Sequence, residues 1–316
     1  MSLVLASTSN MAHDEWLEAR RYGIGGSDVS GICGLNNYKS PLNIYLDKVG
    51  EHIGEHEQSE AAYWGNTLEE VVAREFTKRT GKKVRNRNVI LQHKDYPWML
   101  ANLDRVVVGE NAILECKTAS AYLLKDWDGE EIPDAYILQV QHYLAVTGYE
   151  KAYIACLVGG QKFIYKEVEK DQEIIDYLIN IEKDFWLNHV EKKVPPPVDG
   201  SKASSEVLNI MYPKATVEEV INLDTEIQGL LKHREELKTK ESEIEESINK
   251  IDNRIKNLMG EHATAVAGEF KITWSNVTSK RVDSKKLKEK CPDIYKQYLK
   301  EISSRKFQIK KMKEAK

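Results

Sequence analysis

The sequence predicts an α/β domain followed by a helical extension, and three observations support this division. Across residues 1–194, segments with helical spacing of apolar residues alternate with short β-branched runs, which is typical of a sheet between helices. Residues 195–206 are rich in Pro, Gly and Ser, the composition of a linker. In residues 207–316 a heptad repeat and a basic tail predict a coiled-coil arm of different architecture.

Composition places the chain among ordinary globular proteins. Its 316 residues, 41% of them hydrophobic, suffice for a sizeable core. No apolar run approaches the roughly 20 residues of a membrane span, and the start, MSLVLASTSN, lacks the pattern of a signal peptide, so we expect a cytoplasmic protein. The four cysteines show no CxxC spacing and predict neither a disulfide framework nor a zinc site.

Charge is unevenly distributed along the chain. The formal net charge is only −4, yet residues 280–316 carry 14 Lys or Arg against 5 Asp or Glu, a net of +9. The end of the chain is therefore the part suited to meet a polyanion, although a Lys-rich surface is often only a solvated face.

The first predicted helix covers about residues 14–21, in the segment DEWLEARRYGIGGSDVSGICG. A glycine-rich turn follows, and Ser27 or Asp28 is expected to begin a second helix. Free backbone N–H groups at such a helix start form a ready anion site. The alternative is a tight turn in which the glycines serve only for their backbone freedom.

A longer helix and three strands come next. GNTLEEVVAREFTKRTG predicts a helix capped near Asn66 or Thr67 and ended by Gly81. Three segments then predict strands, of which the last two form a hairpin: KVRNRNVILQH, WMLANLDRVVV and AILECKT. A helix between Pro133 and Gly148, a second hairpin of KAYIACLV and KFIYKEV, and a helix over about 171–191 complete the domain.

Beyond the linker, apolar residues recur in alternating steps of three and four from Val220 to Leu258, at 10 of 12 positions, with Arg234 and Glu241 as the interruptions. This seam fits both an antiparallel arm within the chain and a coiled coil with a partner. EFKITWSNVTSKRVD predicts a strand pair, and residues 284–299 of the basic tail predict a helix.

Two carboxylates and a lysine are expected to converge at the central hairpin. If it closes in a two-residue turn, Asp104 faces Lys117, and Glu115 lies on the same face as a diagonal neighbour of Asp104. A cation relieves the repulsion between neighbouring carboxylates, and Mg²⁺ or Mn²⁺ prefers such oxygen ligands, to which the Cys116 carbonyl could add another. An ordinary salt-bridge cluster is the alternative.

The motif Asp104, then Glu115-x-Lys117, resembles that of PD-(D/E)xK nucleases, whose usual companion is an acidic residue on the preceding helix, here Glu69. Five blocks in order resemble the YqaJ-like viral recombinase family, relatives of the lambda phage exonuclease: RRYGIGGSDVSGICGLNNYKSPLNIYLDKVG, WGNTLEEVVAREF, ANLDRVVV, ECKT and QVQHYLAVTG. The resemblance covers about residues 14–190, with Glu70 where the family usually has proline. It implies a PD-(D/E)xK core, with a central mixed sheet flanked by helices.

The resemblance also implies roles for individual residues. Glu69, Asp104, Glu115 and Lys117 would form the catalytic group, with Asp104 and Glu115 as the main ligands of Mg²⁺ or Mn²⁺ and Glu69 reaching the metal directly or through water. Lys117 would hold the attacking water or neutralise developing negative charge. Gln139 would lie over the active site.

A pocket for a DNA 5′-phosphate is implied around the glycine turn. It would be formed by Ser27 with either Arg20 or Arg21, because the arginine fork matches phosphate oxygens. Asn102 and Tyr143 are further candidates for DNA contact, and for Tyr143 a packed core aromatic is the alternative.

The implied function is a metal-dependent exonuclease that degrades one strand of linear duplex DNA from the 5′ end, leaving 3′ overhangs for recombination by strand annealing. Its partners would be duplex DNA ends, a single-strand annealing protein and further copies of the chain in a ring. We expect a phage or prophage gene in a bacterial host. The alternatives are an endonuclease of the same superfamily and a non-catalytic DNA-binding or scaffold protein.

Overall fold

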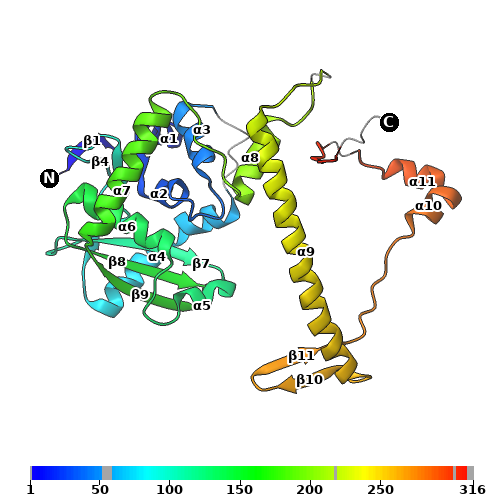
Figure 1. The fold of residues 1–316 in the computed structure, drawn as a ribbon. Helices are drawn as coiled ribbons and strands as arrows, with labels where there is room; N and C mark the ends of the chain where they lie inside the picture. The colour runs from blue at the N-terminus through cyan, green and yellow to red at the C-terminus, as the bar shows by residue number, and fades with distance from the viewer. Residues whose placement is uncertain (1, 52–58, 217–218, 302–303, 312–316) are drawn as a thin grey trace. The chain divides into compact units, whose positions relative to one another are not determined.

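The computed structural model describes residues 2–51, 59–216, 219–301 and 304–311. The chain divides into two compact units, Met1–Pro213 and Lys214–Lys316 (Figure 1). The first unit holds the two larger sheets, and the second is built around one long helix. The predicted α/β domain with a helical extension is therefore confirmed.

The boundary between the units differs from the predicted linker at residues 195–206. Helix α8 (Lys202–Met211) begins inside that segment, because the Ser201 hydroxyl accepts a hydrogen bond from the Ser204 N–H and caps the helix. Val207 of α8 packs into the hydrophobic core of the first unit. The serines thus belong to a helix start, and the first unit extends past the predicted end at residue 194 to residue 213.

The helices of the first unit include all those that the sequence predicts there. They are α1 (His13–Arg21), α2 (Gly26–Ile32), α3 (Pro41–Val49), α4 (Glu60–Thr80), α5 (Leu124–Trp127), α6 (Asp134–Thr147) and α7 (Gln172–Asp184), with a 3₁₀ turn at Ala121–Leu123 and a π-helix at Phe185–Val190. Helix α8 is the last helix of this unit, and α3, α5 and α8 have no counterpart in the prediction. A signal for α3 exists, since Ser40 caps the helix and proline occupies its first position.

Helix α4 begins earlier than the predicted cap at Asn66 or Thr67. Ser59 is the actual cap, and its hydroxyl accepts a hydrogen bond from the Ala62 N–H (3.2 Å). The Thr67 hydroxyl instead donates to the Tyr63 carbonyl (2.9 Å) inside the helix. A threonine in mid-helix was thus mistaken for a cap. The predicted end at Gly81 is confirmed.

The strands of the first unit form two sheets. The four-stranded sheet has the order β1 (Leu3–Ser7), β4 (Val89–Gln92), β5 (Met99–Asn102), β2 (Ile24–Gly25), and the five-stranded sheet the order β3 (Val84–Arg85), β6 (Arg105–Val107), β7 (Ala112–Ala119), β8 (Lys151–Val158), β9 (Lys162–Glu169). Strands β7 and β8 are parallel, whereas β6–β7 and β8–β9 are antiparallel, so the larger sheet is mixed as predicted.

Two of the predicted strands are each divided between the sheets. KVRNRNVILQH contains β3 and β4, and WMLANLDRVVV contains β5 and β6. The breaks fall at the NRN segment, residues 86–88, and at Leu103 and Asp104. Asn and Asp have low strand propensity, which is the local reason for both breaks.

Helices α4 and α6 pack against opposite faces of the five-stranded sheet. Because side chains alternate along β7, Ile113 and Glu115 point to the face covered by α6, whereas Leu114 points to the face covered by α4. Val140 of α6 belongs to the cluster around Ile113, and Phe76 of α4 to the cluster around Leu114. Glu115, the last buried residue of β7, therefore lies beneath α6.

A buried ion pair fixes α6 to its neighbours. The His142 ring is fully buried, with Nδ1 2.8 Å from Oε1 of Glu182 on α7 and Nε2 2.8 Å from the Leu100 carbonyl oxygen on β5. A carboxylate and a carbonyl as the two partners favour a ring that donates from both nitrogens, which is the imidazolium form. Burial alone would lower the pKa of His142, but the Glu182 carboxylate and the carbonyl raise it above its usual value.

The second unit is largely exposed. Its elements are α9 (Thr225–Met259), β10 (Thr264–Ala267), β11 (Phe270–Thr273), α10 (Ser284–Lys290) and α11 (Pro292–Gln297). The strand pair predicted over residues 269–283 lies at 264–273 instead, because Gly268, with φ +58°, makes the turn. The predicted tail helix is interrupted, since Pro292 cannot continue α10 and begins α11.

The long helix α9 contains most of the heptad seam. Val220 and Leu223, the first two seam positions, precede the helix, and the other ten lie within it. Among the described residues, no helix is both long enough and apolar enough to cross a membrane.

The His142–Glu182 pair predicts a specific pH dependence of stability. A raised pKa means that the contribution is fully present below about pH 6.5, the pKa of an unfolded histidine, and is lost as the pH rises through the folded value. Glu182→Gln should lower the free energy of unfolding at pH 6 by about 3 kcal/mol, and should flatten its decline toward pH 9, measured by urea denaturation. Exposed Glu173→Gln on the same helix is the matched control; equal pH profiles in both variants would contradict the assignment.

Candidate active site

The middle of β7 carries a charged network on the face that α6 covers. Lys117 Nζ donates hydrogen bonds to Glu115 Oε1 (2.8 Å) and to Gln139 Oε1 (3.0 Å). Gln139 Nε2 in turn donates to the same Glu115 oxygen (2.7 Å) and to the Tyr143 hydroxyl (3.1 Å). The Glu115 side chain is 4% exposed and that of Lys117 is 20% exposed. The structure thus brings Glu115, Lys117, Gln139 and Tyr143 into one hydrogen-bonded network.

Asp104 joins this network at the backbone. Its Oδ2 accepts a hydrogen bond from the Cys116 N–H (2.8 Å), which places its carboxylate beside the strand that carries Glu115. Burial raises the pKa of Asp104 well above its usual value; the nearby carboxylates of Glu115 and Glu69 raise it further, and Lys117 offsets only part of this. Asp104 thus lies in a cluster with more negative charge than the lysine neutralises.

The predicted register of the β6–β7 hairpin is wrong by two residues. Val106 pairs with Ile113 rather than with Glu115, because the connection is a four-residue loop over 108–111 instead of a two-residue turn. Gly109, with φ +85°, allows the wider loop. A shift of two residues keeps each side chain on its face, so Asp104 still meets the network but lies next to Glu115 instead of opposite Lys117.

Glu69 approaches from the other face of the sheet. Arg105 makes ion pairs with both Glu69 and Glu70 of α4, the latter at 2.8 Å, and its guanidinium also donates to the Asp104 carbonyl oxygen. The Arg105 side chain is 8% exposed, whereas those of Glu69 and Glu70 are 31% and 62% exposed, so only the arginine is enclosed. The Glu69 carboxylate is thus near enough to raise the pKa of Asp104, but an ion pair with Arg105 holds it in place.

The donor set fits one divalent cation on the side of α6. Asp104 and Glu115 offer hard carboxylate oxygens, and their mutual repulsion would be relieved by a positive ion. Burial and nearby carboxylates raise the pKa of the Cys116 thiol, which leaves its backbone carbonyl as the useful donor. Within the described part of the chain, no three His, Cys, Asp or Glu side chains converge as a ready metal cluster. Glu69 would have to leave Arg105 to join.

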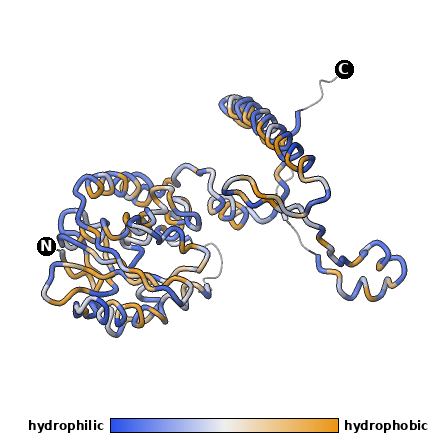
Figure 2. Tube along the Cα trace, turned by 90° about the horizontal axis from the view of Figure 1, so that it is seen from below, coloured by the Kyte–Doolittle hydropathy of each residue, from blue (hydrophilic) through white to orange (hydrophobic). Residues whose placement is uncertain are grey.

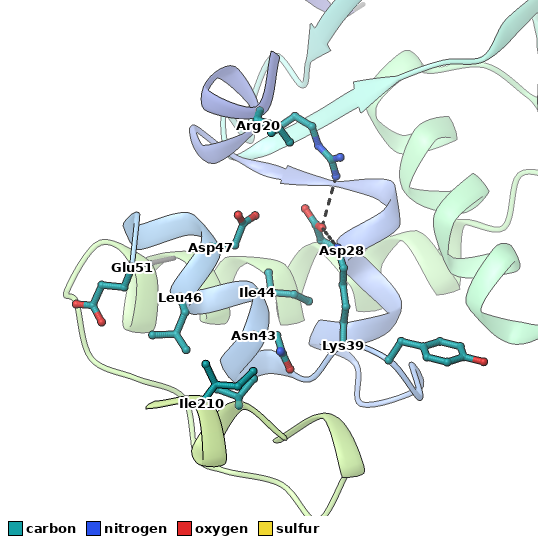
Figure 3. A pocket seen from close by; sticks show the side chains of 12 residues that line it. Arg20, Asp28, Lys39, Asn43, Ile44, Leu46, Asp47, Glu51 and Ile210 are labelled. Atoms are coloured by element: carbon teal, nitrogen blue, oxygen red, sulfur yellow. Dashed lines mark ion pairs between the residues drawn. The ribbon is translucent and has the colours of Figure 1, made fainter. Parts of the chain in front are cut away.

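A second candidate site lies at the start of α2 (Figure 3). Arg20 Nη2 donates to the Ser27 hydroxyl (2.8 Å) and is 3.6 Å from Asp28 Oδ1. Arg21 instead forms an ion pair with Glu18, also of α1. The sequence leaves open whether Arg20 or Arg21 accompanies Ser27. In the structure it is Arg20.

Asp28 anchors this second site. Lys48 Nζ is fully buried and donates to Asp28 Oδ2 (2.7 Å), and the Gly25 N–H donates to the same oxygen (3.1 Å). Burial alone would raise the pKa of Asp28, but Lys48, Arg20 and Lys39 together lower it well below its usual range. The helix begins at Gly26, one residue before the predicted start, because Gly25 is the cap.

Beside Asp28 lies a pocket of about 370 Å³. Arg20 and Lys39 supply its positive charge, with Lys39 Nζ 3.9 Å from Asp28 Oδ1 and its side chain 51% exposed. Asp47 and Glu51 line another part of the wall, as Figure 3 shows, so the cationic part is confined to two side chains. Sequence reasoning missed Lys39, Lys48 and the anchoring role of Asp28, because no spacing connects these residues to Arg20.

Tyr143 connects the two sites. Its side chain is 5% exposed, and the Cβ of any larger residue at Gly26 would lie 2.5 Å from Tyr143 Cε1. Burial and nearby carboxylates raise the pKa of the Tyr143 hydroxyl well above its usual value. Tyr143 is therefore packed in the core, as the alternative interpretation expects. Helix α2 rests directly on its ring, and Gln139 donates a hydrogen bond to its hydroxyl.

Asn102 lies at the end of β5 and does not line the pocket beside Asp28. It lines a separate cavity of about 210 Å³ together with Glu69, Asp104 and Arg105. The NRN segment, residues 86–88, forms part of the same wall. The sequence prediction does not include this segment in the site. The signal for it was the interruption of a predicted strand by three polar residues.

The mixed sheet between helices, with Asp104, Glu115 and Lys117 gathered at β7, is the arrangement that the sequence motif of a PD-(D/E)xK core predicts. The domain model of the YqaJ-like viral recombinase domain matches residues 15–150. The chain is also 46% identical over 311 residues, 98% of each chain, to a protein of Bacillus subtilis strain 168 known as "Uncharacterized protein YqaJ". The chain belongs to the YqaJ-like viral recombinase family, which confirms the resemblance.

Two solved structures are similar at low sequence identity. An alkaline exonuclease from Laribacter hongkongensis, LHK-Exo, is 18% identical with a TM-score of 0.49, over 57% of this chain and 94% of that chain. A phage-related exonuclease from Haemophilus somnus 129PT is 14% identical with a TM-score of 0.39, over 54% of this chain and 96% of that chain.

The contact between Gly26 and Tyr143 predicts contrasting effects at two helical glycines. Gly26→Ala should lower the free energy of unfolding by about 1–3 kcal/mol, because the new methyl group meets a buried ring that cannot withdraw. Gly65→Ala in α4 is the control: its Cβ would lie 3.7 Å from Thr118 Oγ1, and helix propensity should raise stability by up to about 1 kcal/mol. Urea denaturation measures both, and equal stability of the two variants would contradict the packing.

Proposed function

We propose that the protein is a metal-dependent deoxyribonuclease that degrades one strand of linear duplex DNA from the 5′ end. The observation that carries the proposal is the network of Glu115, Lys117 and Gln139 with Asp104 beside it. A lysine held next to two acidic oxygen donors is suited to hydrolysis of a phosphodiester. Membership in a viral recombinase family supports a role in DNA processing.

Asp104, Glu115 and the Cys116 carbonyl are the groups that would hold Mg²⁺ or Mn²⁺. Such an ion, when bound, supplies Lewis-acid stabilisation of the phosphoryl group and a more acidic bound water. Gln139 and Lys117 both donate to Oε1 of Glu115, which leaves Oε2 as the oxygen that would bind the ion. Glu69 adds a third carboxylate if Arg105 releases it.

Lys117 acts on the reacting phosphate. An ammonium group has three N–H donors, and Glu115 and Gln139 accept two of them. The remaining donor of this partly exposed side chain is available for the attacking water or for a phosphate oxygen. Its positive charge then stabilises the negative charge that develops on phosphorus oxygens during attack.

The pocket at α2 is the proposed 5′-phosphate site. Arg20 is already oriented by Ser27 and Asp28, so its fork is preorganised for a terminal phosphate, and Lys39 adds a second positive charge. Because α2 rests on Tyr143, which contacts Gln139, a phosphate held there has a defined position relative to Lys117. A phosphate anchored in this way sets the direction of degradation from the 5′ end.

The product, a 3′ overhang, is the substrate for strand annealing. We therefore propose that the protein acts in phage-type recombination with a single-strand annealing protein as its partner, and that several copies assemble into a ring around the duplex. The basic tail after residue 280 is a further candidate for contact with DNA.

The active-site proposal predicts loss of nuclease activity in two variants. Glu115→Ala and Lys117→Ala should each reduce Mg²⁺-dependent release of nucleotides from linear duplex DNA by about 10²- to 10³-fold. The matched controls are Glu167→Ala and Lys151→Ala. Each of them breaks a Lys–Glu ion pair of 2.7 Å between β8 and β9 of the same sheet, outside the network of Glu115 and Lys117. Full activity in both active-site variants would refute the proposal, and cleavage of closed circular DNA would indicate an endonuclease.

The phosphate pocket predicts a difference between two adjacent arginines. Arg20→Gln should abolish the preference for a 5′-phosphorylated over a 5′-hydroxyl duplex end, because it removes the fork that faces Ser27 and Asp28. Arg21→Gln should keep that preference, since Arg21 pairs with Glu18 instead. The ratio of initial rates on the two ends is the measurement, and an unchanged ratio in Arg20→Gln would rule out the pocket.

A further inference from the structure

Helix α9 presents an apolar stripe that its own unit leaves open. The helix has 35 residues, and side chains of its seam are largely exposed: Leu230 60%, Leu237 50%, Ile244 61%, Ile248 53%, Ile251 60% and Leu258 78%. In Figure 2 apolar residues recur along α9 between hydrophilic ones. An isolated helix depends on the burial of such a stripe for stability, so this face requires a partner.

We propose that the stripe binds the α9 helix of a second copy of this chain in an antiparallel coiled coil. The seam residues alternate between the a and d positions of the heptad, and in an antiparallel pair each a position faces a d position of the other helix. One register brings the whole seam into contact: Ile227 opposite Leu258, Leu230 opposite Ile255, and Leu237 opposite Ile248 of the second copy. These pairs repeat by two-fold symmetry, so a single surface is complementary to itself.

The two interruptions in the seam favour the antiparallel arrangement. A parallel pair would place Arg234 against Arg234 and Glu241 against Glu241 at the centre of the interface, where like charges repel. In the antiparallel register Arg234 lies opposite Ile251 and Glu241 opposite Ile244 of the second copy. Each long side chain can then extend its charged end to the edge of the interface.

Charges beside the seam complement each other in the same register. Lys238 and Glu245 each directly follow a seam residue, so both lie on the same side of the seam. The antiparallel pairing brings Lys238 of each copy near Glu245 of the other. The charge pattern of α9 thus supports the register that the apolar positions select.

The length of α9 is sufficient for a stable pair. At about 1.5 Å per residue the helix is roughly 52 Å long, and a face about 10 Å wide on each copy gives roughly 1,000 Å² in total. This is the size at which specific protein interfaces begin.

The inference does not depend on the proposed nuclease function. If the first unit forms a ring, pairing through α9 would join that ring to another.

The first test measures the number of copies per particle in the full-length protein by light scattering after gel filtration. Ile248→Lys interrupts two layers of the pair by symmetry and should halve this number. Asn253→Lys places the same charge on the opposite side of the helix and should leave it unchanged. An unaltered number in Ile248→Lys, or a wild-type chain that is already a monomer, would overturn the proposal.

The second test reads the direction of pairing and does not depend on a disrupted interface. In a Cys291→Ser background, Leu230→Cys and Ile255→Cys chains are oxidised separately and after mixing. The antiparallel register predicts a disulfide-linked dimer only in the mixture, because residue 230 of one copy faces residue 255 of the other. Self-linking of either single variant, as a parallel pair predicts, or no link in the mixture would overturn it. The Cys291→Ser chain without new cysteines is the control.

Discussion

The contact between Gln139 and Glu115 is the interaction on which the site depends. It joins the end of a buried strand to the helix that covers it, with the amide at 2.7 Å from a carboxylate that is almost fully enclosed. An enclosed carboxylate requires partners, and Gln139 and Lys117 supply them. Strand β7 and helix α6 are therefore held in one relative position by the same groups that would bind substrate.

The same contact extends to the pocket at α2. Gln139 reaches Tyr143, the Tyr143 ring packs on Gly26, and Gly26 begins the helix that carries Asp28. The fully buried Lys48 then fixes Asp28, which orients Arg20. A continuous series of packed and hydrogen-bonded groups thus connects the pocket beside Arg20 and Lys39 with the carboxylates.

Glu69 shows how charge is balanced around the carboxylates. Arg105 neutralises Glu69 and Glu70 on one face of the sheet, while Lys117 neutralises Glu115 on the other. Asp104, between them, receives only a backbone hydrogen bond, and its pKa is raised as a result of burial and its acidic neighbours. The excess negative charge is concentrated where a cation would be useful.

Much of this protein was determined by local sequence. Capping residues and glycines located α6, α7, β8 and β9, and the two-residue repeat of strands placed Glu115 and Lys117 on one face, because these patterns act over a few residues. Tertiary structure decided the rest: which sheet each half of a divided strand joined, that Arg20 rather than Arg21 meets Ser27, and that Arg105 holds Glu69. These outcomes depend on contacts between residues distant in the chain, as between Lys48 and Asp28, which no local spacing encodes.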